Sequence, residues 1–444
     1  MFFKPKRLIR KENPVKSIHS LEQLVSFVRQ HSNYYSAHLK HLPTTGITLK
    51  DLPLTNVTNY WTGSNDLNHW SVLTGNVDDA LVFKTGGSTS QGKLAVYSYE
   101  EWQTLVSTFG NSLSSQLNNG DRVANLFFSG DLYASFLFVH DSLAHVGRSI
   151  CEFPFTGDIE PDVLADAIAR HRINVLAGVP AQLLRFAAYL TQHRRVLCGV
   201  ETLLYGGESL FAPQLAILGE VFPNARIASI GYASVDAGLI GASTRDCALG
   251  EHRVFEQQTL LQIIDEHTGE VIEECDRIGM LVQTNLTRRL MPLLRYPVGD
   301  RACWREPTAT PRRKFALKGR SAHSQRVRVG VLSLFTEEIH EIIQRVSHSE
   351  QWQLLIEQTG SKDLLSVKWV PEPQSQAVEP VLRALREALL AHYPAIDDLS
   401  HEGLLEFRVL CCAATDLQLH PRSGKQLRVR DLRVYDVCSQ EPAQ

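Results

Sequence analysis

Apolar residues recur along this chain at two spacings, and the change from one to the other marks its parts. Between residues 15 and 40 the apolar positions follow a helical period, with polar residues on the other face. This pattern predicts an amphipathic helix. Residues 52–61 include Pro53 and are expected to cross the surface as a loop.

From residue 80 onward, short apolar runs alternate with helical stretches. Strands are predicted at 81–83, 123–128, 175–179, 203–205 and 227–230. Helices are predicted at 163–171 and 181–193. Strands that alternate with helices predict a largely parallel sheet with helices on both faces.

The pattern changes to strand and turn from about residue 259, with runs at 260–265 and 279–284 that predict a β-rich subdomain. A basic stretch without clear periodicity follows, from Arg312 to Arg320, and we expect the main boundary at its end. Beyond it the pattern predicts an α+β module. Its helices are expected at 337–346 and 381–392, and its strands at 353–356 and 365–369.

The predicted fold class is therefore α/β, with two domains. Residues 1–318 would form a large N-terminal domain of mixed sheets flanked by helices, together with the β-rich subdomain. Residues 319–444 would form a small, mobile α+β domain. Both lengths suit independent domains.

Composition narrows the class of partner. The chain has 444 residues, 45 basic and 48 acidic, so its net charge of −3 gives no reason to expect nucleic acid or an anionic membrane as partner. No segment reaches the roughly 18 apolar residues of a membrane span, and no apolar run follows the charged start as in a secretory signal. The 8 cysteines are scattered without a Cys-x-x-Cys pair, which predicts reduced thiols in a cytoplasm.

A segment rich in glycine and hydroxyl residues, 84–93, directly follows one predicted strand. Consecutive glycines let backbone N–H groups converge on an anion, and Lys93 adds a cation. No hydroxyl residue follows Lys93, so the segment is not the P-loop of NTPases. Taken alone, such a segment is more often a surface turn.

Two more polar loops, 206–209 and 231–236, also follow predicted strands. Because ligands of open α/β sheets bind outside the carboxyl ends of the strands, these loops are expected to share one crevice. A tyrosine ring can stack on a purine, and the carboxylate of Glu208 or Asp236 can hold Mg²⁺. Each residue alone equally fits a core tyrosine or a charge at a helix start.

Two later motifs add charged groups. In Arg295–Asp300 a carboxylate after a Gly turn suits ribose hydroxyls, although an Asp that caps a turn is commoner. In 421–428 a Gly precedes Lys425, which suits a mobile cation; an exposed basic loop is the simpler interpretation.

In this order, and over nearly the whole chain, these motifs resemble those of the acyl- and aryl-CoA synthetase superfamily of adenylate-forming enzymes. The resemblance is greatest to phenylacetate–CoA ligases and their relatives in antibiotic and phenazine biosynthesis. The family's phosphate loop corresponds to 85–93, its adenine loop to 206–208, its Tyr-Gly-Leu-Ser-Glu motif to 232–236 and its Arg-Tyr-x-x-Gly-Asp motif to 295–300. Residues 319–321 match the family hinge, and 421–425 resemble its closing lysine motif.

The resemblance implies a two-step reaction, in which a carboxylate and ATP give an acyl-adenylate and an acceptor then expels AMP. It gives catalytic roles to Lys425 and to Asp236, which also holds Mg²⁺. It places the ATP phosphates on Thr85, Gly86, Gly87, Ser88, Thr89 and Lys93. It places adenine and ribose on Gly207, Glu208, Tyr232, Ala233, Asp300 and Arg320. The acid pocket is assigned to Tyr133, Phe136, Gly206 and Ser234.

The implied cofactors are ATP and Mg²⁺, with CoA as one candidate acceptor. The first hypothesis is an acid–thiol ligase that activates a small aryl or apolar acid and transfers it to CoA or a carrier protein. An amine acceptor, which gives an amide, and a nucleotide-binding homologue without turnover are the alternatives. A homodimer is left open.

Several residues depart from the family pattern. Ser90, Gln91 and Ala233 replace residues of the nucleotide motifs, and Asp236 is one methylene shorter than the usual Glu. Ala322, His323 and Ser333 depart from the usual residues after the hinge, which weakens the case for domain rotation and for CoA. Cys247 and His252 lie where some relatives bind zinc, but the matching downstream cysteine pair is missing.

Overall fold

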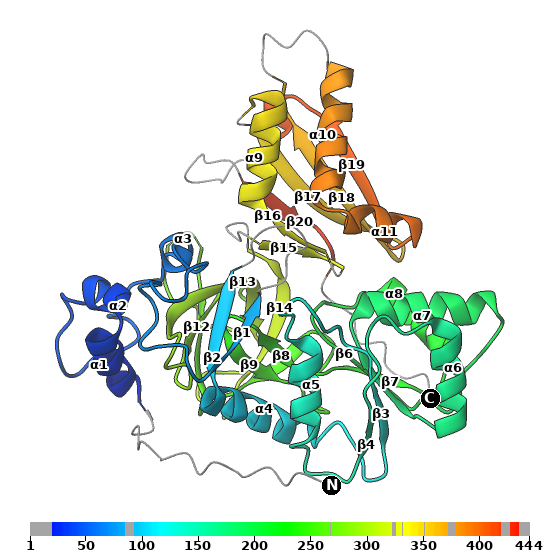
Figure 1. Cartoon of the computed structure of the whole chain (residues 1–444). Helices are drawn as coiled ribbons and strands as arrows, with labels where there is room; N and C mark the ends of the chain where they lie inside the picture. Colours follow the sequence, from blue (N-terminus) through cyan, green and yellow to red (C-terminus); the bar gives the residue numbers. More distant parts are fainter. Residues whose placement is uncertain are drawn as a thin grey trace, which may run out of the picture.

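The computed structural model describes residues 20–84, 93–266, 268–321, 326–330, 332–349, 351–371, 378–418 and 427–434. Figure 1 shows a larger part with two main sheets below a smaller part built from the last third of the chain. Among the described residues, no helix is both long enough and apolar enough to cross a membrane.

A five-stranded parallel sheet, in the order β4-β3-β5-β6-β7, forms the α/β portion of the larger part. Its strands are β3 (Arg122–Asn125), β4 (Cys151–Phe153), β5 (Val175–Gly178), β6 (Thr202–Tyr205) and β7 (Arg226–Ser229). The helices around it are α4 (Tyr99–Leu113), α5 (Ser135–Leu143), α6 (Pro161–His171), α7 (Pro180–Gln192) and α8 (Ala212–Val221).

Successive residues of these strands pack into opposite cores, because strand side chains alternate in direction. Leu204 packs with α4 and α5, whereas its neighbour Leu203 packs with α6, α7 and α8. Both α6 and α7 begin with a proline, whose fixed φ suits the first helical turn. The prediction of a parallel sheet with helices on both faces is confirmed.

A seven-stranded antiparallel sheet packs beside it, in the order β11-β12-β13-β14-β10-β9-β8. Its strands are β8 (Tyr232–Ser234), β9 (Gly238–Ala242), β10 (Glu251–Val254), β11 (Thr259–Ile264), β12 (Gly279–Asn285), β13 (Leu293–Trp304) and β14 (Lys314–Arg320). The predicted β-rich subdomain is therefore present, but it is larger than the sequence pattern indicated.

The basic stretch before the predicted boundary showed no clear periodicity in the sequence. In the structure most of it, from Lys314 to Arg320, forms strand β14. Its cations obscured the strand pattern, and they are matched by acids on neighbouring elements. Lys314 Nζ lies 3.5 Å from Glu251 Oε2 on β10, and Arg320 pairs with an acid on β13. Between them Phe315 is fully buried.

Three short helices, α1 (Leu21–His31), α2 (Asn33–His38) and α3 (Val57–Trp61), and the hairpin of β1 (Ala80–Lys84) and β2 (Leu94–Ser98) complete the larger part. The amphipathic helix predicted near the start is confirmed as α1. The loop predicted at 52–61 contains α3 instead, because the Asn56 side chain caps the Asn59 N–H and Tyr60 and Trp61 are buried.

The smaller part has its own sheets and core, which includes Trp352, Trp369 and Tyr393. Its strands are β15 (Arg326–Val329), β16 (Leu332–Phe335), β17 (Trp352–Thr359), β18 (Lys362–Trp369), β19 (Leu405–Cys411) and β20 (Val429–Asp431). Its helices are α9 (Thr336–Ser347), α10 (Val378–His392) and α11 (Ala395–His401). The two parts share no strand, and a domain boundary at residue 318 remains a proposal.

Glu101 connects helix α4 to the antiparallel sheet. One carboxylate oxygen accepts the Ser98 N–H at 2.9 Å and completes a capping box. The other accepts the backbone N–H groups of Arg289 and Leu290, in the connection between β12 and β13. Glu101 is only 4% exposed, so three N–H groups depend on a buried carboxylate.

We expect Glu101→Ala to lower the free energy of unfolding by about 3 kcal/mol, because it removes a cap and leaves two N–H groups without an acceptor. Glu100→Ala is the matched control. Its side chain is 70% exposed and pairs with Arg289, so the change is expected to stay within about 0.5 kcal/mol. Urea unfolding of both variants measures the difference, and equal losses would contradict this role of Glu101.

Candidate functional site

A cavity of about 620 Å³ lies at the carboxyl ends of the parallel strands, where the smaller part meets the larger one. The loops after β3, β5, β6 and β7 line it, together with β8, β13 and β14 of the antiparallel sheet. Residues of β15 and β18 line it from the smaller part. Such a position is where open α/β sheets bind ligands.

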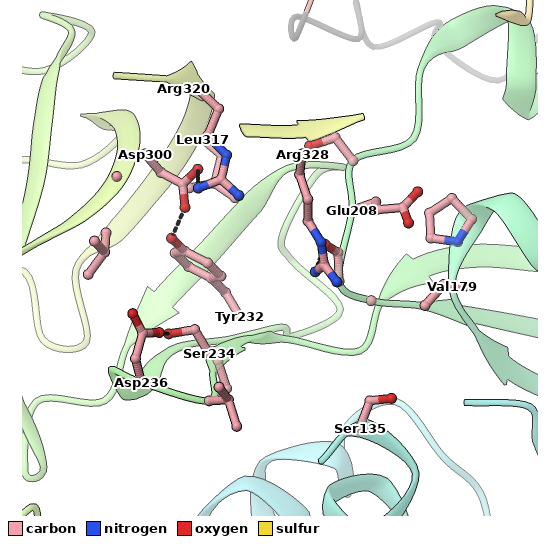
Figure 2. Close-up of a pocket in the computed structure, with 18 of the residues that line it drawn as sticks. Ser135, Val179, Glu208, Tyr232, Ser234, Asp236, Asp300, Leu317, Arg320 and Arg328 are labelled. Atoms are coloured by element: carbon pink, nitrogen blue, oxygen red, sulfur yellow. Dashed lines mark hydrogen bonds and ion pairs between the residues drawn. The ribbon is translucent and has the colours of Figure 1, made fainter. Parts of the chain in front are cut away.

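The carboxylate of Asp300 joins three elements at one side of this cavity (Figure 2). Its Oδ1 lies 2.9 Å from Nη1 of Arg320, and its Oδ2 accepts a hydrogen bond from the Tyr232 hydroxyl. Burial, reinforced by Asp300, raises the pKa of Tyr232 well above its usual range. Tyr232 therefore stays protonated and remains a hydrogen-bond donor.

Strand register explains why Asp300 and Arg320 meet. The two residues are direct partners in the β13–β14 ladder, and the ladder shifts register between Asp300 and Ala302. Gly299 and Gly319 precede them with φ of 87° and 89°, values that favour glycine. The sequence suggested that Asp300 follows a turn. In the structure it lies within a bulged strand.

Asp236 lies on the same side of the cavity, just after β8. Its Oδ1 accepts the Ser234 hydroxyl at 2.7 Å, and its Oδ2 accepts the Tyr296 hydroxyl at 3.1 Å. These two donors fix the direction of the carboxylate. A carboxylate oxygen accepts more than one bond, so Asp236 retains the capacity to bind a cation such as Mg²⁺.

Arg328 crosses from β15 of the smaller part to the loop after β6. Its Nη1 donates to the Gly207 carbonyl at 2.8 Å, and its Nη2 donates to the Tyr133 hydroxyl at 2.9 Å. Figure 2 shows its guanidinium between Tyr232 and Glu208. The side chain thus divides the cavity into two ends.

The Glu208 carboxyl lies beyond Arg328. Its Oε1 is completely buried, and it accepts no hydrogen bond from the described residues. Burial raises the pKa of Glu208 to about 7, although Arg328 acts in the opposite direction. The group is therefore close to half ionised at neutral pH.

Aromatic side chains form one wall of the cavity. Trp102 and Phe109 come from α4, and Phe127 and Phe138 follow β3. The Phe109 and Phe138 ring centroids are 4.6 Å apart. Such a wall suits an aryl or other apolar group more than a charged one.

No family model matches the sequence. The fold, however, is that of known ligases. A 2-hydroxyisobutyryl-CoA ligase in complex with 2-HIB-AMP and CoA matches 93% of this chain and 88% of its own, with a TM-score of 0.65 and 15% identity. The amide bond synthetase McbA from Marinactinospora thermotolerans matches 91% of this chain and 81% of its own, with a TM-score of 0.52 and 15% identity.

Two sequence relatives are more informative. Over 232 residues the chain is 28% identical to indoleacetate–lysine synthetase of Pseudomonas savastanoi, which covers 51% of this chain and 54% of that protein. Over 124 residues it is 35% identical to phenylacetate–coenzyme A ligase of Aromatoleum evansii, which covers 28% of each. These likenesses agree with the resemblance to adenylate-forming enzymes that the sequence motifs carry. The chain spans about half the length of the first relative and less of the second.

The structure brings most of the predicted site residues into the one cavity. The lining includes Lys93, Tyr133, Gly206, Gly207, Glu208, Tyr232, Ala233, Ser234, Asp236, Asp300 and Arg320. Lys93 Nζ lies 5.6 Å from the centre of the Trp61 ring. The predicted phosphate-loop residues 85–89 and Lys425 lie outside the described residues.

Phe136 is not among the residues that line the cavity. Its ring stacks on His140, with centroids 6.2 Å apart. On helix α5 the cavity is lined by Ser135, Phe138 and Val139, which share one face at helical spacing. Phe136 projects from a different face of the helix, so the structure does not bring it to this cavity.

Sequence reasoning missed the aromatic wall and Arg328. A signal for α4 was present, because Ser98 and Glu101 form a capping box ahead of apolar residues at helical spacing. Arg328 had no comparable signal. Its contact with Gly207 joins residues 121 positions apart in different parts of the fold.

His252 was the candidate zinc ligand. It is buried, its Nε2 lies 3.0 Å from the Ser229 hydroxyl, and burial lowers its pKa to about 4. Within the described part of the chain, no three His, Cys, Asp or Glu side chains are grouped to hold a metal ion. The described contacts of His252 are those of a neutral core histidine.

We expect the stability effect of Glu208→Gln to depend on pH. The raised pKa means that the folded chain binds this proton more tightly than the unfolded chain, whose Glu titrates near 4.5. The contribution of Glu208 to stability therefore falls as pH rises from about 5 to about 7 and stays low above that. Relative to the unsubstituted chain, the free energy of unfolding of Glu208→Gln is expected to be about 1 kcal/mol higher at pH 8 and unchanged at pH 5. Urea unfolding at both pH values measures this, and an equal effect at the two would contradict it.

Proposed function

We propose that this chain is an AMP-forming ligase that activates a small aryl or apolar carboxylic acid as an acyl-adenylate, with release of pyrophosphate. One observation carries the proposal. Tyr232, Asp236 and the Asp300–Arg320 pair converge on a single cavity that has an aromatic wall. The nucleotide and the acid therefore have adjacent sites in one space.

The nucleotide would occupy the side of the cavity near Asp300. Ribose hydroxyls would donate to the Asp300 carboxylate, which Arg320 and Tyr232 hold in place. The ring of Tyr232 would lie against adenine, opposite the loop of Gly207 and Glu208. A carboxylate whose position is fixed before binding loses little freedom when the ligand arrives.

The acid carboxylate would attack the α-phosphorus of ATP, and pyrophosphate would leave. Negative charge then grows on the phosphate oxygens, so cations and N–H donors supply most of the stabilisation. Lys93, the segment 85–89 and Lys425 are the proposed donors. Mg²⁺, held by Asp236, would neutralise phosphate charge when bound. Lys425 would arrive with a mobile C-terminal domain at 319–444.

The acceptor predicted from the sequence is the thiol of CoA or of a carrier protein, with an amine as the alternative. Of the two sequence relatives, the phenylacetate–coenzyme A ligase is named for a thiol acceptor and the indoleacetate–lysine synthetase for an amine acceptor. Both acceptors share the adenylation step, but they differ in charge. The charged residues at the end of the cavity beyond Arg328 therefore bear on whether a thiol or an amine is the acceptor.

We expect exchange of pyrophosphate into ATP, in the presence of Mg²⁺, with aryl or apolar acids such as indole-3-acetate, phenylacetate, benzoate or hexanoate. Burial of an apolar ring against the aromatic wall favours these acids by roughly 25 cal/mol per Å². Malonate, which carries a second charge, is the matched control and is expected to give no exchange. Silence for every acid, with ATP binding measured separately, would instead support a nucleotide-binding homologue without turnover.

Lys425→Ala is expected to lower the exchange rate by about a hundredfold or more, because a cation at the developing phosphate charge is lost. ATP binding and the unfolding midpoint should change little. Arg422→Ala, which removes a neighbouring cation, is the matched control. Exchange by Lys425→Ala at the unsubstituted rate would show that the assignment of Lys425 is wrong.

A further inference from the structure

The end of the cavity beyond Arg328 lies between the two parts of the chain. Glu208 and Phe211 line it from the larger part, and Asp363, Leu404 and Arg433 line it from the smaller part. None of these groups except Glu208 belongs to the proposed nucleotide site. This end of the cavity, which we call the interdomain end, is accordingly available for a second substrate.

Most nitrogens of the two cations at the interdomain end are directed at groups other than Glu208, although Arg328 Nε is buried without an acceptor among the described residues. Arg433 donates to both oxygens of Asp431, at 2.9 Å and 2.7 Å, and its Nη1 lies 3.5 Å from Asp363 Oδ1. Arg328 directs two of its nitrogens at uncharged oxygens, those of Gly207 and Tyr133. Three carboxylates therefore face two guanidinium groups.

Glu208 Oε1 and Asp363 Oδ1 are both buried without a hydrogen bond from the described residues, and of the two only Asp363 has an ion-pair partner among those residues, Arg433, at 3.5 Å. The Glu208 side chain as a whole is half-buried, and its Oε1 is the oxygen that is shielded from bulk solvent. A buried carboxylate oxygen without a donor is unfavourable unless a ligand provides donors or positive charge. The side chains of Asp363 and Arg433 nearby are only 8% and 7% exposed, which keeps the surroundings of Glu208 shielded.

We propose that the interdomain end binds a cationic amine as the acyl acceptor, with the Glu208 carboxylate as the ligand of its ammonium group. This inference rests on the proposed adenylation. An ammonium group supplies a positive charge and three N–H donors, which are what Glu208 lacks. A thiol supplies one weak donor and no charge, and its reactive thiolate would face the carboxylates of Glu208 and Asp363.

The chemistry of amide formation agrees with this assignment. Glu208 takes one proton from the ammonium group, and the freed nitrogen lone pair attacks the acyl carbon of the adenylate. The bond between that carbon and the phosphate oxygen breaks, and AMP leaves with the electron pair. The second N–H proton passes to water, which leaves the neutral amide. Burial raises the pKa of Glu208 to about 7, with Asp363 acting in the same direction and Arg328 and Arg433 against it, so Glu208 can accept and release a proton near neutral pH.

Trapping the adenylate tests the proposal directly. The full chain is incubated with ATP, Mg²⁺ and an acid that supports exchange, and then with one of three nucleophiles. These are CoA, hydroxylamine, which is small and uncharged at neutral pH, and a panel of cationic amines: L-lysine, putrescine, cadaverine and tyramine. Mass spectrometry quantifies the thioester, hydroxamate and amide products. We expect hydroxamate and at least one amide, with amide at least tenfold above thioester.

The variant Glu208→Gln is compared with Glu402→Gln, which removes a carboxylate that pairs with Arg185 outside the cavity. The ratio of amide to hydroxamate is expected to fall at least tenfold in Glu208→Gln and to stay unchanged in Glu402→Gln. The ratio remains informative if Glu208→Gln also slows adenylation.

The outcomes are separable. Hydroxamate without any amide, or thioester as the main product, would overturn the amine acceptor and leave adenylation standing. An unchanged ratio in Glu208→Gln would overturn the role of Glu208. Absence of hydroxamate would show that no adenylate forms, and it would overturn the proposed function together with this inference. The comparison of nucleophiles uses the unsubstituted protein, so it does not depend on the folding of any variant.

Discussion

The Asp300 carboxylate is the group on which the arrangement of the cavity depends. It accepts the Tyr232 hydroxyl from β8 and pairs with Arg320 from β14, so one side chain fixes three strands of the antiparallel sheet at the cavity wall. If Arg320 or Tyr232 were buried without Asp300, its polar group would lack this partner. Strand β14 ends at Arg320, immediately before the chain leaves for the smaller part. The ion pair with Asp300 therefore fixes Arg320, the last strand residue of the larger part before the connection to the smaller part.

This arrangement explains how two unlike sheets make one site. The parallel sheet contributes loops, because its strands all end at the same edge. The antiparallel sheet contributes residues within strands, held by ladder register at a bulge, as in the Asp300 and Arg320 pair. Loops can move when a ligand enters, whereas strand residues are fixed on both sides. The proposed ribose contact is on the fixed sheet, and the loop of Gly207 and Glu208 faces the smaller part.

Much of this was predictable from the sequence where one short segment decides the structure. Fully buried, mainly apolar runs such as β5 and β6 were found because both of their faces are covered, and the motif residues after them line one cavity. Strand β14 was missed because its cations mask the strand period and are matched only by distant acids. Phe136 lies outside the cavity because a shift of one position on a helix turns the side chain to another face. Arg328 could not be found, since its role exists only when residues 121 positions apart meet.

The two ends of the cavity differ in a way that bears on the choice of acceptor. At the nucleotide end the Asp300 carboxylate is matched by Arg320, so that end is complete before any ligand binds. At the interdomain end Glu208 lacks a hydrogen-bond donor among the described residues, so that end is complete only with a ligand. Pyrophosphate would carry away most of the phosphate charge during adenylation, so a cationic acceptor would then depend mainly on the fixed carboxylates of the interdomain end. The proposed selection of a cationic acceptor therefore rests on Glu208 and not on the phosphate groups of the nucleotide.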